Sequence, residues 1–287
     1  MSKVAVEISQ GIATITFNRP ETLNAITPED YDAFASALWA IDKRDDVLVT
    51  VWQATGKWFC AGTSVTGTNV GPQSARDYFV NNVARANTDT TRALYSHSKI
   101  LVAALNGPVM AFLGFFDLFT FSLKPSLQRT DFSSGIITES GSSVTFRNRM
   151  GAAKANEVLI FGKKKDAQEL LECGFINKIF PAEPVPSFHA AVRTHLLAEL
   201  EGLDPVALLH VKKLIKAGLN EQHNFDAVNL RESYARLSGS PLVFPQSGLA
   251  KSPGRSLDTS CDAKAWALKA VKCYRTGYLL VNLGYIP

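Results

Sequence analysis

The sequence predicts an α/β layered fold with crossover helices, and two observations support this prediction. Two apolar runs, Val47–Gln53 and Lys99–Leu105, have the unbroken hydrophobicity of strands buried on both faces of a parallel sheet. Each run follows a predicted helix, over residues 27–41 and 74–95 respectively. Alternation of strands and helices favours parallel strands joined by helical crossovers.

Composition describes an ordinary globular chain. Its 287 residues are 46% apolar, enough to bury a full core as one large domain or one domain with a helical extension. The net charge of +4 is dispersed, which argues against a nucleic-acid partner. The only tight basic run, Lys163-Lys164-Lys165, is interpreted as a solvated loop or as a site for a ligand phosphate.

The distribution of cysteines and histidines predicts neither a metal site nor disulfides. None of the four cysteines lies in a CxxC pattern, and none of the five histidines forms an HExxH pair. The first residues alternate like a strand rather than forming a signal peptide. We therefore expect free thiols in a reducing intracellular compartment, at Cys60, Cys173, Cys261 and Cys273.

The segment Ile100–Phe121 is apolar and long enough to cross a membrane. It contains the turn Asn106-Gly107-Pro108 and the carboxylate of Asp117, and both are unfavourable inside lipid. A buried strand, a turn and a buried helix fit this segment better. No membrane partner is expected.

The elements of the first half follow in order from local signals. Val4–Val6 and Ile12–Phe17 read as a hairpin, and residues 18–25 read as a loop. Thr27 is the expected N-cap of the next helix, with Pro28 in the first turn and Asp30 at the capping-box position. Residues 59–64 leave the following strand as a turn of small residues.

The second half is predicted to be mainly helical. A short strand is expected at Phe175–Phe180, and the looser, Ser/Gly/Pro-containing pattern from Leu237 onward predicts an extension over 237–287. The expected helices are Ala152–Phe161, Asp166–Cys173, Ser187–Leu200, Pro205–Ala217 and Asn224–Ala235.

Glu139 is the main candidate for chemistry. It lies between the apolar pair Ile136-Ile137 and the small residues 140–143. Partial desolvation there would raise its pKa and make it a better proton acceptor, while the small residues would allow a close backbone or ligand approach. The alternative is an acid at a helix start, stabilised by the helix dipole.

Several motifs in one order resemble the crotonase (enoyl-CoA hydratase/isomerase) superfamily, and most closely its fungal peroxisomal Δ3,Δ2-enoyl-CoA isomerases. The resemblance implies a crotonase-like ββα spiral core over 1–190, a helical trimerisation region over 191–236 and an atypical C-terminal extension over 237–287. It also implies a CoA thioester as the substrate and no separate cofactor. The matching segments are 16–25, Phe59-Cys60-Ala61-Gly62, 104–108, 132–134, 138–141 and Gly151-Ala152-Ala153-Lys154-Ala155.

The resemblance also implies roles for particular residues. Glu139 would remove a proton from C2 of a 3-enoyl-CoA and return one at C4, and the Thr63 backbone N–H would stabilise the enolate oxyanion. Taken singly, Asn18-Arg19-Pro20 is interpreted as an ordinary turn and Cys60-Ala61-Gly62 as a tight exit from a strand. The residues expected to bind the CoA substrate are Asn18, Arg19, Leu23, Ala25, Ala61, Gly62, Thr63, Ser64, Val65, Ala111 and Phe112.

Two features bear on which branch of this superfamily the chain resembles and on its activity. Hydratases need paired Glu residues, but here Glu139 has only Asp131 nearby, which reads as a loop aspartate. Isomerase is therefore favoured over hydratase. About four residues of the family turn are absent after Met110, so Ala111 or Phe112 would have to supply the second oxyanion N–H, and a weak or inactive subunit remains an alternative.

The resemblance also implies an assembly and a location. A homotrimer or hexamer is expected, with related subunits as an alternative partner. The implied pathway is fatty-acid β-oxidation, or a fungal secondary pathway for an unsaturated acyl chain. A peroxisomal location is expected by resemblance, although the chain ends in Gly-Tyr-Ile-Pro rather than a Ser-Lys-Leu type signal; the cytoplasm is the alternative.

Overall fold

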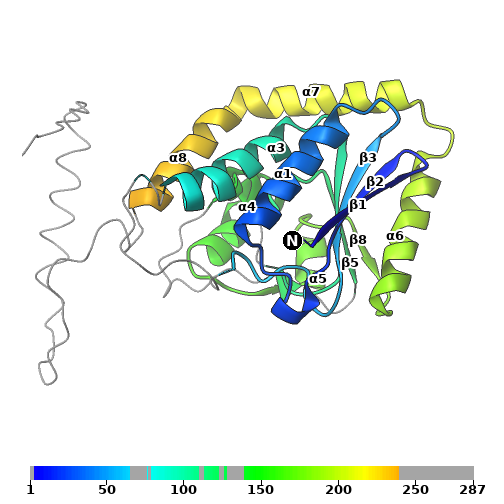
Figure 1. The fold of residues 1–287 in the computed structure, drawn as a ribbon, viewed down its shortest axis with the longest axis horizontal. Helices are drawn as coiled ribbons and strands as arrows, with labels where there is room; N and C mark the ends of the chain where they lie inside the picture. The colour runs from blue at the N-terminus through cyan, green and yellow to red at the C-terminus, as the bar shows by residue number, and fades with distance from the viewer. Residues whose placement is uncertain are drawn as a thin grey trace, which may run out of the picture. The chain divides into compact units, whose positions relative to one another are not determined.

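A six-stranded sheet in the order β1-β2-β3-β4-β5-β8 organises the chain (Figure 1). The computed structural model describes residues 3–64, 76, 79–109, 113–122, 126–127 and 139–238. β1 and β2 pair antiparallel as the predicted hairpin, and every later pair is parallel, which confirms the α/β fold. The strands are β1 Val4–Ser9, β2 Ile12–Phe17, β3 Val49–Ala54, β4 Ile100–Leu105, β5 Leu118–Ser122 and β8 Lys178–Phe180.

The helices follow the predicted order with shifted ends. They are α1 Pro28–Asp42, α3 Thr90–Ser96, α4 Ser142–Leu159, α5 Ala167–Glu172, α6 Val185–Leu200, α7 Pro205–His223 and α8 Phe225–Ser238. A π-helix, η2 (Phe79–Asp89), precedes α3, and a 3-10 turn, η1, covers Pro20–Thr22. A small second sheet pairs β6 (Ser126–Leu127) with β7 (Lys165–Asp166). The predicted extension falls outside the described residues apart from Leu237 and Ser238.

Both faces of the sheet are covered, as the unbroken apolar strands predicted (Figure 1). On one face, the Trp52 ring packs 4.8 Å from that of Phe34 on α1 and 5.0 Å from that of Phe17, between ring centroids. On the other face, Val51 and Val102 belong to a separate apolar cluster that α6 completes. The sheet is therefore the middle layer of a helix–sheet–helix arrangement.

The predicted capping box of α1 is confirmed. The Asp30 N–H donates to Thr27 Oγ1 at 3.3 Å, and the Thr27 N–H donates to Asp30 Oδ2 at 3.1 Å. Each residue thus satisfies a backbone donor of the other at the helix start. The prediction that α4 begins at Ala152 is wrong: it begins at Ser142, and Gly151, with φ 74° and ψ 162°, kinks it internally.

The prediction of a buried helix within 100–121 is also wrong, because residues 118–122 form strand β5. The run Leu-Phe-Thr-Phe-Ser is aromatic and β-branched, which suits a strand between two parallel neighbours. The Asp117 carboxylate accepts a hydrogen bond from Leu101 N–H at 2.7 Å and an ion pair from Lys212 Nζ at 2.7 Å. Within the described part of the chain, no helix is long and apolar enough to span a bilayer.

α7 lies along the outside of the molecule and buries none of its residues (Figure 1). Its exposed apolar side chains include Val211, Leu214 and Ile215, which are 53%, 72% and 60% exposed. α8 turns back onto η2 and α3, where Asn229 Nδ2 donates to Thr88 O at 3.0 Å. The two helices therefore differ: α8 is packed on the core, and α7 keeps an apolar face open.

A close backbone approach makes Gly107 a sensitive position. A Cβ added there would lie 2.1 Å from Lys57 O and 3.0 Å from Trp58 Cα, so the 57–58 turn would have to move. We expect Gly107→Ala to lower the free energy of unfolding by roughly 1–3 kcal/mol, measured by urea titration. Gly218→Ala in α7 is the matched control, because nothing lies within 4 Å of an added Cβ there. It should be neutral or stabilise by up to about 1 kcal/mol; equal effects of the two variants would contradict the prediction.

Buried His97 predicts a loss of stability in mild acid. Its Nε2 lies 2.9 Å from Thr50 Oγ1, and burial, followed by the charge of Lys212, lowers its pKa to about 3. Since the unfolded chain binds this proton near the ordinary value of 6.5, stability is full above pH 6.5 and falls as the pH drops toward 3. His189, whose pKa burial lowers to about 4, acts in the same direction.

The His97→Gln variant tests this pH dependence. Between pH 7 and 5.5, each buried histidine should lower the free energy of unfolding by roughly 1 kcal/mol. Urea titrations at both pH values should therefore show about half of the wild-type decrease in the variant, with His189 supplying the rest. A decrease as large as that of the wild type would show that His97 is not responsible.

Candidate functional site

The predicted CoA-binding loops meet at the carboxyl ends of β2, β3 and β4. Ala61 N–H donates to Leu23 O at 3.0 Å, and Ile26 N–H donates to Gly62 O at 2.8 Å. On the other side, Phe59 N–H donates to Pro108 O at 3.1 Å. The strand exit at 59–64 therefore lies between the 23–26 loop and the Asn106-Gly107-Pro108 turn.

The register of this exit directs the Thr63 N–H outward, that is, away from Ile26 and the 23–26 loop. Ile26 bonds to the residues on both sides of Thr63, because Ser64 N–H donates to Ile26 O at 2.8 Å. In a parallel bridge the backbone groups of the intervening residue point the other way. The Thr63 N–H makes no hydrogen bond to another described residue, while its hydroxyl lies 2.7 Å from the Tyr31 hydroxyl.

Polar side chains of the 18–25 loop bind neighbouring segments and so fix the position of the loop. Arg19 Nη2 lies 3.1 Å from Asp30 Oδ2 in a mostly buried ion pair. Asn18 Oδ1 accepts from the Thr55 hydroxyl at 2.9 Å. These contacts orient the loop, and they leave Leu23, 41% exposed, as its projecting apolar side chain.

Asn24 is the structural residue of this loop that the sequence analysis missed. Its side chain is buried and its Nδ2 donates to Thr55 O at 2.7 Å and Trp58 O at 2.8 Å. Its Oδ1 accepts from Arg19 N–H at 2.8 Å. Asn24 has a φ of 54°, in the left-handed region that Asn adopts more readily than most residues. An Asn within the 18–25 loop was therefore the sequence signal for a tight turn at this position.

Glu139 lies half-buried in the turn that leads into α4. Its carbonyl accepts from Ser142 N–H at 3.2 Å, and the N-cap of α4 is Gly141. The acid that caps the helix is a different one: the Glu232 carboxylate of α8 accepts from Gly141 N–H at 2.6 Å and from Ser143 N–H at 3.1 Å. The alternative interpretation of Glu139 as the helix-start acid is therefore weakened.

The small residues around Glu139 permit close packing, as predicted. A Cβ on Gly141 would lie 2.2 Å from Cζ of the Phe115 ring, and one on Gly114 would lie 3.1 Å from Ser140 O. The turn between β4 and β5 thus packs directly on the start of α4. Because that same connection begins with Gly107 and Pro108 beside the 59–60 exit, the Glu139 turn and the two loops are joined through one connecting segment.

Several residues considered in the sequence lie outside the described part of the chain: Val65, Ala111, Phe112, Asp131, the motif 132–134, Cys261 and Cys273. The second oxyanion donor expected near Ala111 therefore stays a prediction. The described residues that come together are Leu23, Ala25, Ala61, Gly62, Thr63 and Ser64 at the strand exits.

Two other predicted features are structural. Lys165 is buried and pairs with Glu157 at 2.6 Å and Glu169 at 3.3 Å, so it is not part of a solvated loop. Cys60 is buried, which raises the pKa of its thiol to about 12 and leaves it uncharged. Cys173 is likewise free. In the described residues, no cluster of His, Cys, Asp or Glu could hold a metal ion.

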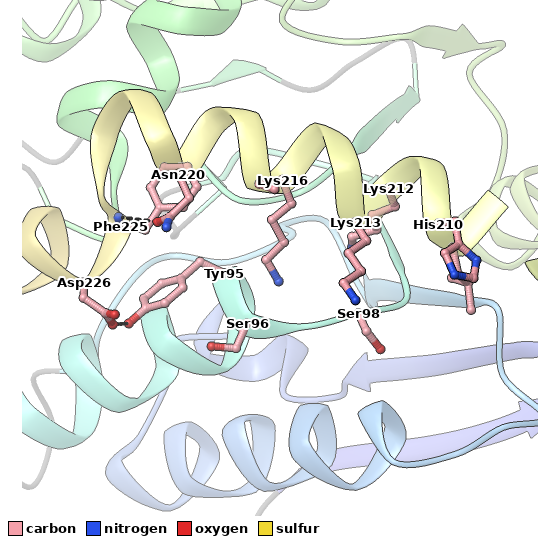
Figure 2. Close-up of a pocket in the computed structure, with 12 residues that line it drawn as sticks. Tyr95, Ser96, Ser98, His210, Lys212, Lys213, Lys216, Asn220, Phe225 and Asp226 are labelled. Atoms are coloured by element: carbon pink, nitrogen blue, oxygen red, sulfur yellow. Dashed lines mark hydrogen bonds between the residues drawn. The ribbon is translucent and has the colours of Figure 1, made fainter. Parts of the chain in front are cut away.

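A cavity of about 620 Å³ lies under α7 and contains none of the predicted site residues (Figure 2). Two of its lysines fasten α7 to the segments that precede β4 and β5. Lys212 Nζ pairs with Asp117, and Lys216 Nζ donates to His97 O at 3.2 Å. Burial, followed by the charge of Lys212, lowers the Lys216 pKa to about 8. These contacts give Lys212 and Lys216 a structural role in attaching α7.

Comparisons with known proteins agree with this geometry. The chain matches the enoyl-CoA hydratase/isomerase family over residues 7–238. It is 30% identical to a Delta(3,5)-Delta(2,4)-dienoyl-CoA isomerase of Pyricularia oryzae, over 84% of this chain and 92% of that protein. It is also 30% identical to a 3,2-trans-enoyl-CoA isomerase of Saccharomyces cerevisiae, over 84% of this chain and 91% of the relative.

A solved structure has the same fold. The enoyl-CoA hydratase/isomerase of Pseudoalteromonas atlantica superposes with a TM-score of 0.72 at 23% identity, over 84% of this chain and 94% of that one. The crotonase-like fold expected from the motifs is thereby confirmed. With the family match extending from β1 to the end of α8, the chain belongs to the enoyl-CoA hydratase/isomerase family.

Proposed function

We propose that this protein shifts the double bond of a 3-enoyl-CoA to the 2-trans position, with Glu139 as the base. The observation that carries the proposal is the position of Glu139 in the turn before α4, with the helix N-terminus already capped by Glu232. The name of the Saccharomyces cerevisiae relative supports the reaction. Family membership alone supports only an enoyl-CoA isomerase or hydratase.

The proposed reaction is a proton relocation. The Glu139 carboxylate takes a proton from C2, and the C2–H electron pair makes the thioester an enolate that is conjugated with the C3–C4 double bond. When the thioester carbonyl re-forms, the C1–C2 π pair moves to C2–C3, and the C3–C4 π pair takes a proton from the Glu139 carboxyl group at C4. The base is regenerated and nothing is oxidised or reduced, so the reaction needs no resident cofactor.

Charge on the enolate oxygen needs donors that are already in place. The outward Thr63 N–H is proposed as one of them, since the Ile26 bridge fixes its direction before substrate binds. A single donor of this kind is typically worth about 10²–10³ in rate. The CoA moiety is proposed to lie along the 18–25 loop and the 61–65 exit, with Leu23 and Ala25 as apolar contacts.

Three alternatives to this function can be separated by assaying the protein with different acyl-CoA substrates. The Pyricularia oryzae relative is named for a dienoyl-CoA substrate, hydratases share the family, and a weak or inactive subunit is the third alternative. Purified protein should be given 3-enoyl-CoA, 3,5-dienoyl-CoA and 2-enoyl-CoA in parallel. Formation of 2-enoyl-CoA from the first substrate supports the proposal. Acyl-CoA binding without conversion of any of them would support a non-catalytic subunit.

Location and pathway are proposed from relatives. A mouse relative, 29% identical over 83% of this chain, is named as peroxisomal. We propose a peroxisomal location and a role in the oxidation of unsaturated fatty acids or of a related acyl chain.

Replacing the proposed base gives a direct test. Glu139→Gln keeps the size and polarity of the side chain but cannot accept the proton, so kcat should fall by about 10²–10⁴-fold. Binding of a saturated acyl-CoA, measured by calorimetry, should be largely unchanged. Glu201→Gln, at an exposed position after α6, is the control and should behave as wild type. Normal turnover in Glu139→Gln would eliminate this residue as the base.

The open face of α7 underlies a proposed trimer or hexamer. Leu214 is 72% exposed and Ile215 60% exposed on a helix with no buried residue, an arrangement that favours burial against a second copy. Leu214→Glu should therefore lower the assembly state seen by light scattering at micromolar concentration. A wild-type monomer, or an unchanged assembly in the variant, would contradict the α7 interface.

A further inference from the structure

Glu232 makes a buried contact that the proposed chemistry does not use. It lies on α8 and is 4% exposed, and its carboxylate accepts from Gly141 N–H at 2.6 Å and Ser143 N–H at 3.1 Å. The Ser143 hydroxyl donates to the same carboxylate. Hydrogen bonds to a charged acceptor are the strong kind, so α8 is firmly attached to the start of α4.

A second connection from α8 reaches the residue immediately after Glu139. Asn87 Oδ1 accepts from the Ser140 N–H at 3.2 Å and from its hydroxyl at 3.1 Å. Asn87 is oriented in turn by Ser233, because its Nδ2 donates to Ser233 Oγ at 2.9 Å. Adjacent residues of α8 therefore hold Ser140 and Gly141, one through Asn87 and one directly.

Local capping is not available at this helix start. Gly141 occupies the N-cap position, with φ 74°, and the Phe115 ring fills the space that its Cβ would need. A Ser, Thr, Asp or Asn there, the usual solution, would collide with that ring. The acceptor for the Gly141 and Ser143 N–H groups therefore comes from another element.

A buried carboxylate is a costly acceptor for a purely structural cap. Burial raises the Glu232 pKa, and the hydrogen bonds from Ser143 and Gly141 oppose that effect. The same carboxylate has a positional consequence: its two oxygens are shared between the N–H groups of residues 141 and 143, so they fix the direction in which the chain enters α4. Glu139 is two residues before that point.

We propose that Glu232 is a positioning residue for Glu139, acting from α8 on the backbone of Gly141 and Ser143, two and four residues after the base. The inference rests on the proposed function, because it needs Glu139 to be the group whose placement matters. A displaced catalytic group can cost about 10²-fold in rate even when substrate binding is kept. Because Glu232 bonds to the backbone of Gly141 and Ser143 at the start of α4, away from the predicted CoA loops, its effect should appear in kcat rather than in KM.

Glu232→Gln is the informative variant. Gln keeps the length of the side chain, but its NH₂ group faces one of the two backbone donors, so only one N–H keeps an acceptor. We expect kcat to fall by about 10–10²-fold, with KM changed by less than about twofold. Glu232→Asp keeps two acceptor oxygens on a shorter stem and should recover part of the loss.

Asn229→Ala is the matched control for a general weakening of α8. Asn229 is buried on the same helix, and its side chain donates to Thr88 O at 3.0 Å, on η2 and not on the turn that carries Glu139. Its loss should lower the thermal unfolding midpoint about as much as Glu232→Gln does, while kcat of the folded protein stays within about twofold of wild type. An equal loss of kcat in both variants would assign the effect to α8 packing and overturn the proposal.

Hydrogen–deuterium exchange supplies a readout that does not depend on turnover. The peptide covering 139–146 should exchange faster in Glu232→Gln than in the wild type and in Asn229→Ala, because the amide of Gly141 or of Ser143 loses its acceptor. If the wild type converts none of the enoyl-CoA substrates, the proposed function fails, and exchange still shows whether Glu232 holds the turn. Unchanged exchange in Glu232→Gln, or unchanged kcat in an active enzyme, would overturn the positioning role.

Discussion

The site depends on one constraint: backbone groups beyond the ends of the parallel strands are buried and still need hydrogen-bond partners. Asn24 meets most of this need, because one side-chain amide binds the carbonyls of Thr55 and Trp58 and the N–H of Arg19. With these groups satisfied, the 23–26 loop can continue the ladder along 61–64. The outward direction of the Thr63 N–H is a consequence of that register and requires no side chain.

The same need for hydrogen-bond partners recurs at the start of α4, where a residue far away in the sequence supplies the acceptor. Gly114 and Gly141 lack side chains because Thr145, Ser140 and Phe115 occupy the space. Close packing of this kind brings the β4–β5 connection against the Glu139 turn, but it removes the ordinary N-cap. Glu232 supplies the missing acceptor, so the packing that shapes the site also makes it depend on the helical region.

Local signals explain why much of the fold could be predicted. Thr27, Pro28 and Asp30 act on each other within one helical turn, so the start of α1 can be read from four adjacent residues. Residues 118–122 were misread as a helix because a short apolar run has no decisive period, and only pairing with β4 and β8 identifies a strand. The boundary of α4 was displaced because Gly151 interrupts the helix without ending it.

The site was predictable only in part for a related reason. Glu139 and the small residues beside it form a local pattern, whereas the partners that fix them are far away in sequence: Asn87 is 53 residues from Ser140, and Glu232 is 91 from Gly141. No periodicity links such positions. The sequence divided the chain into a core over 1–190 and a helical region over 191–236, yet Glu232 of the second completes the helix start of the first. If α7 does hold subunits together, α8 follows it directly in the chain and binds the turn that carries the proposed base, so assembly and catalysis would share one structural unit.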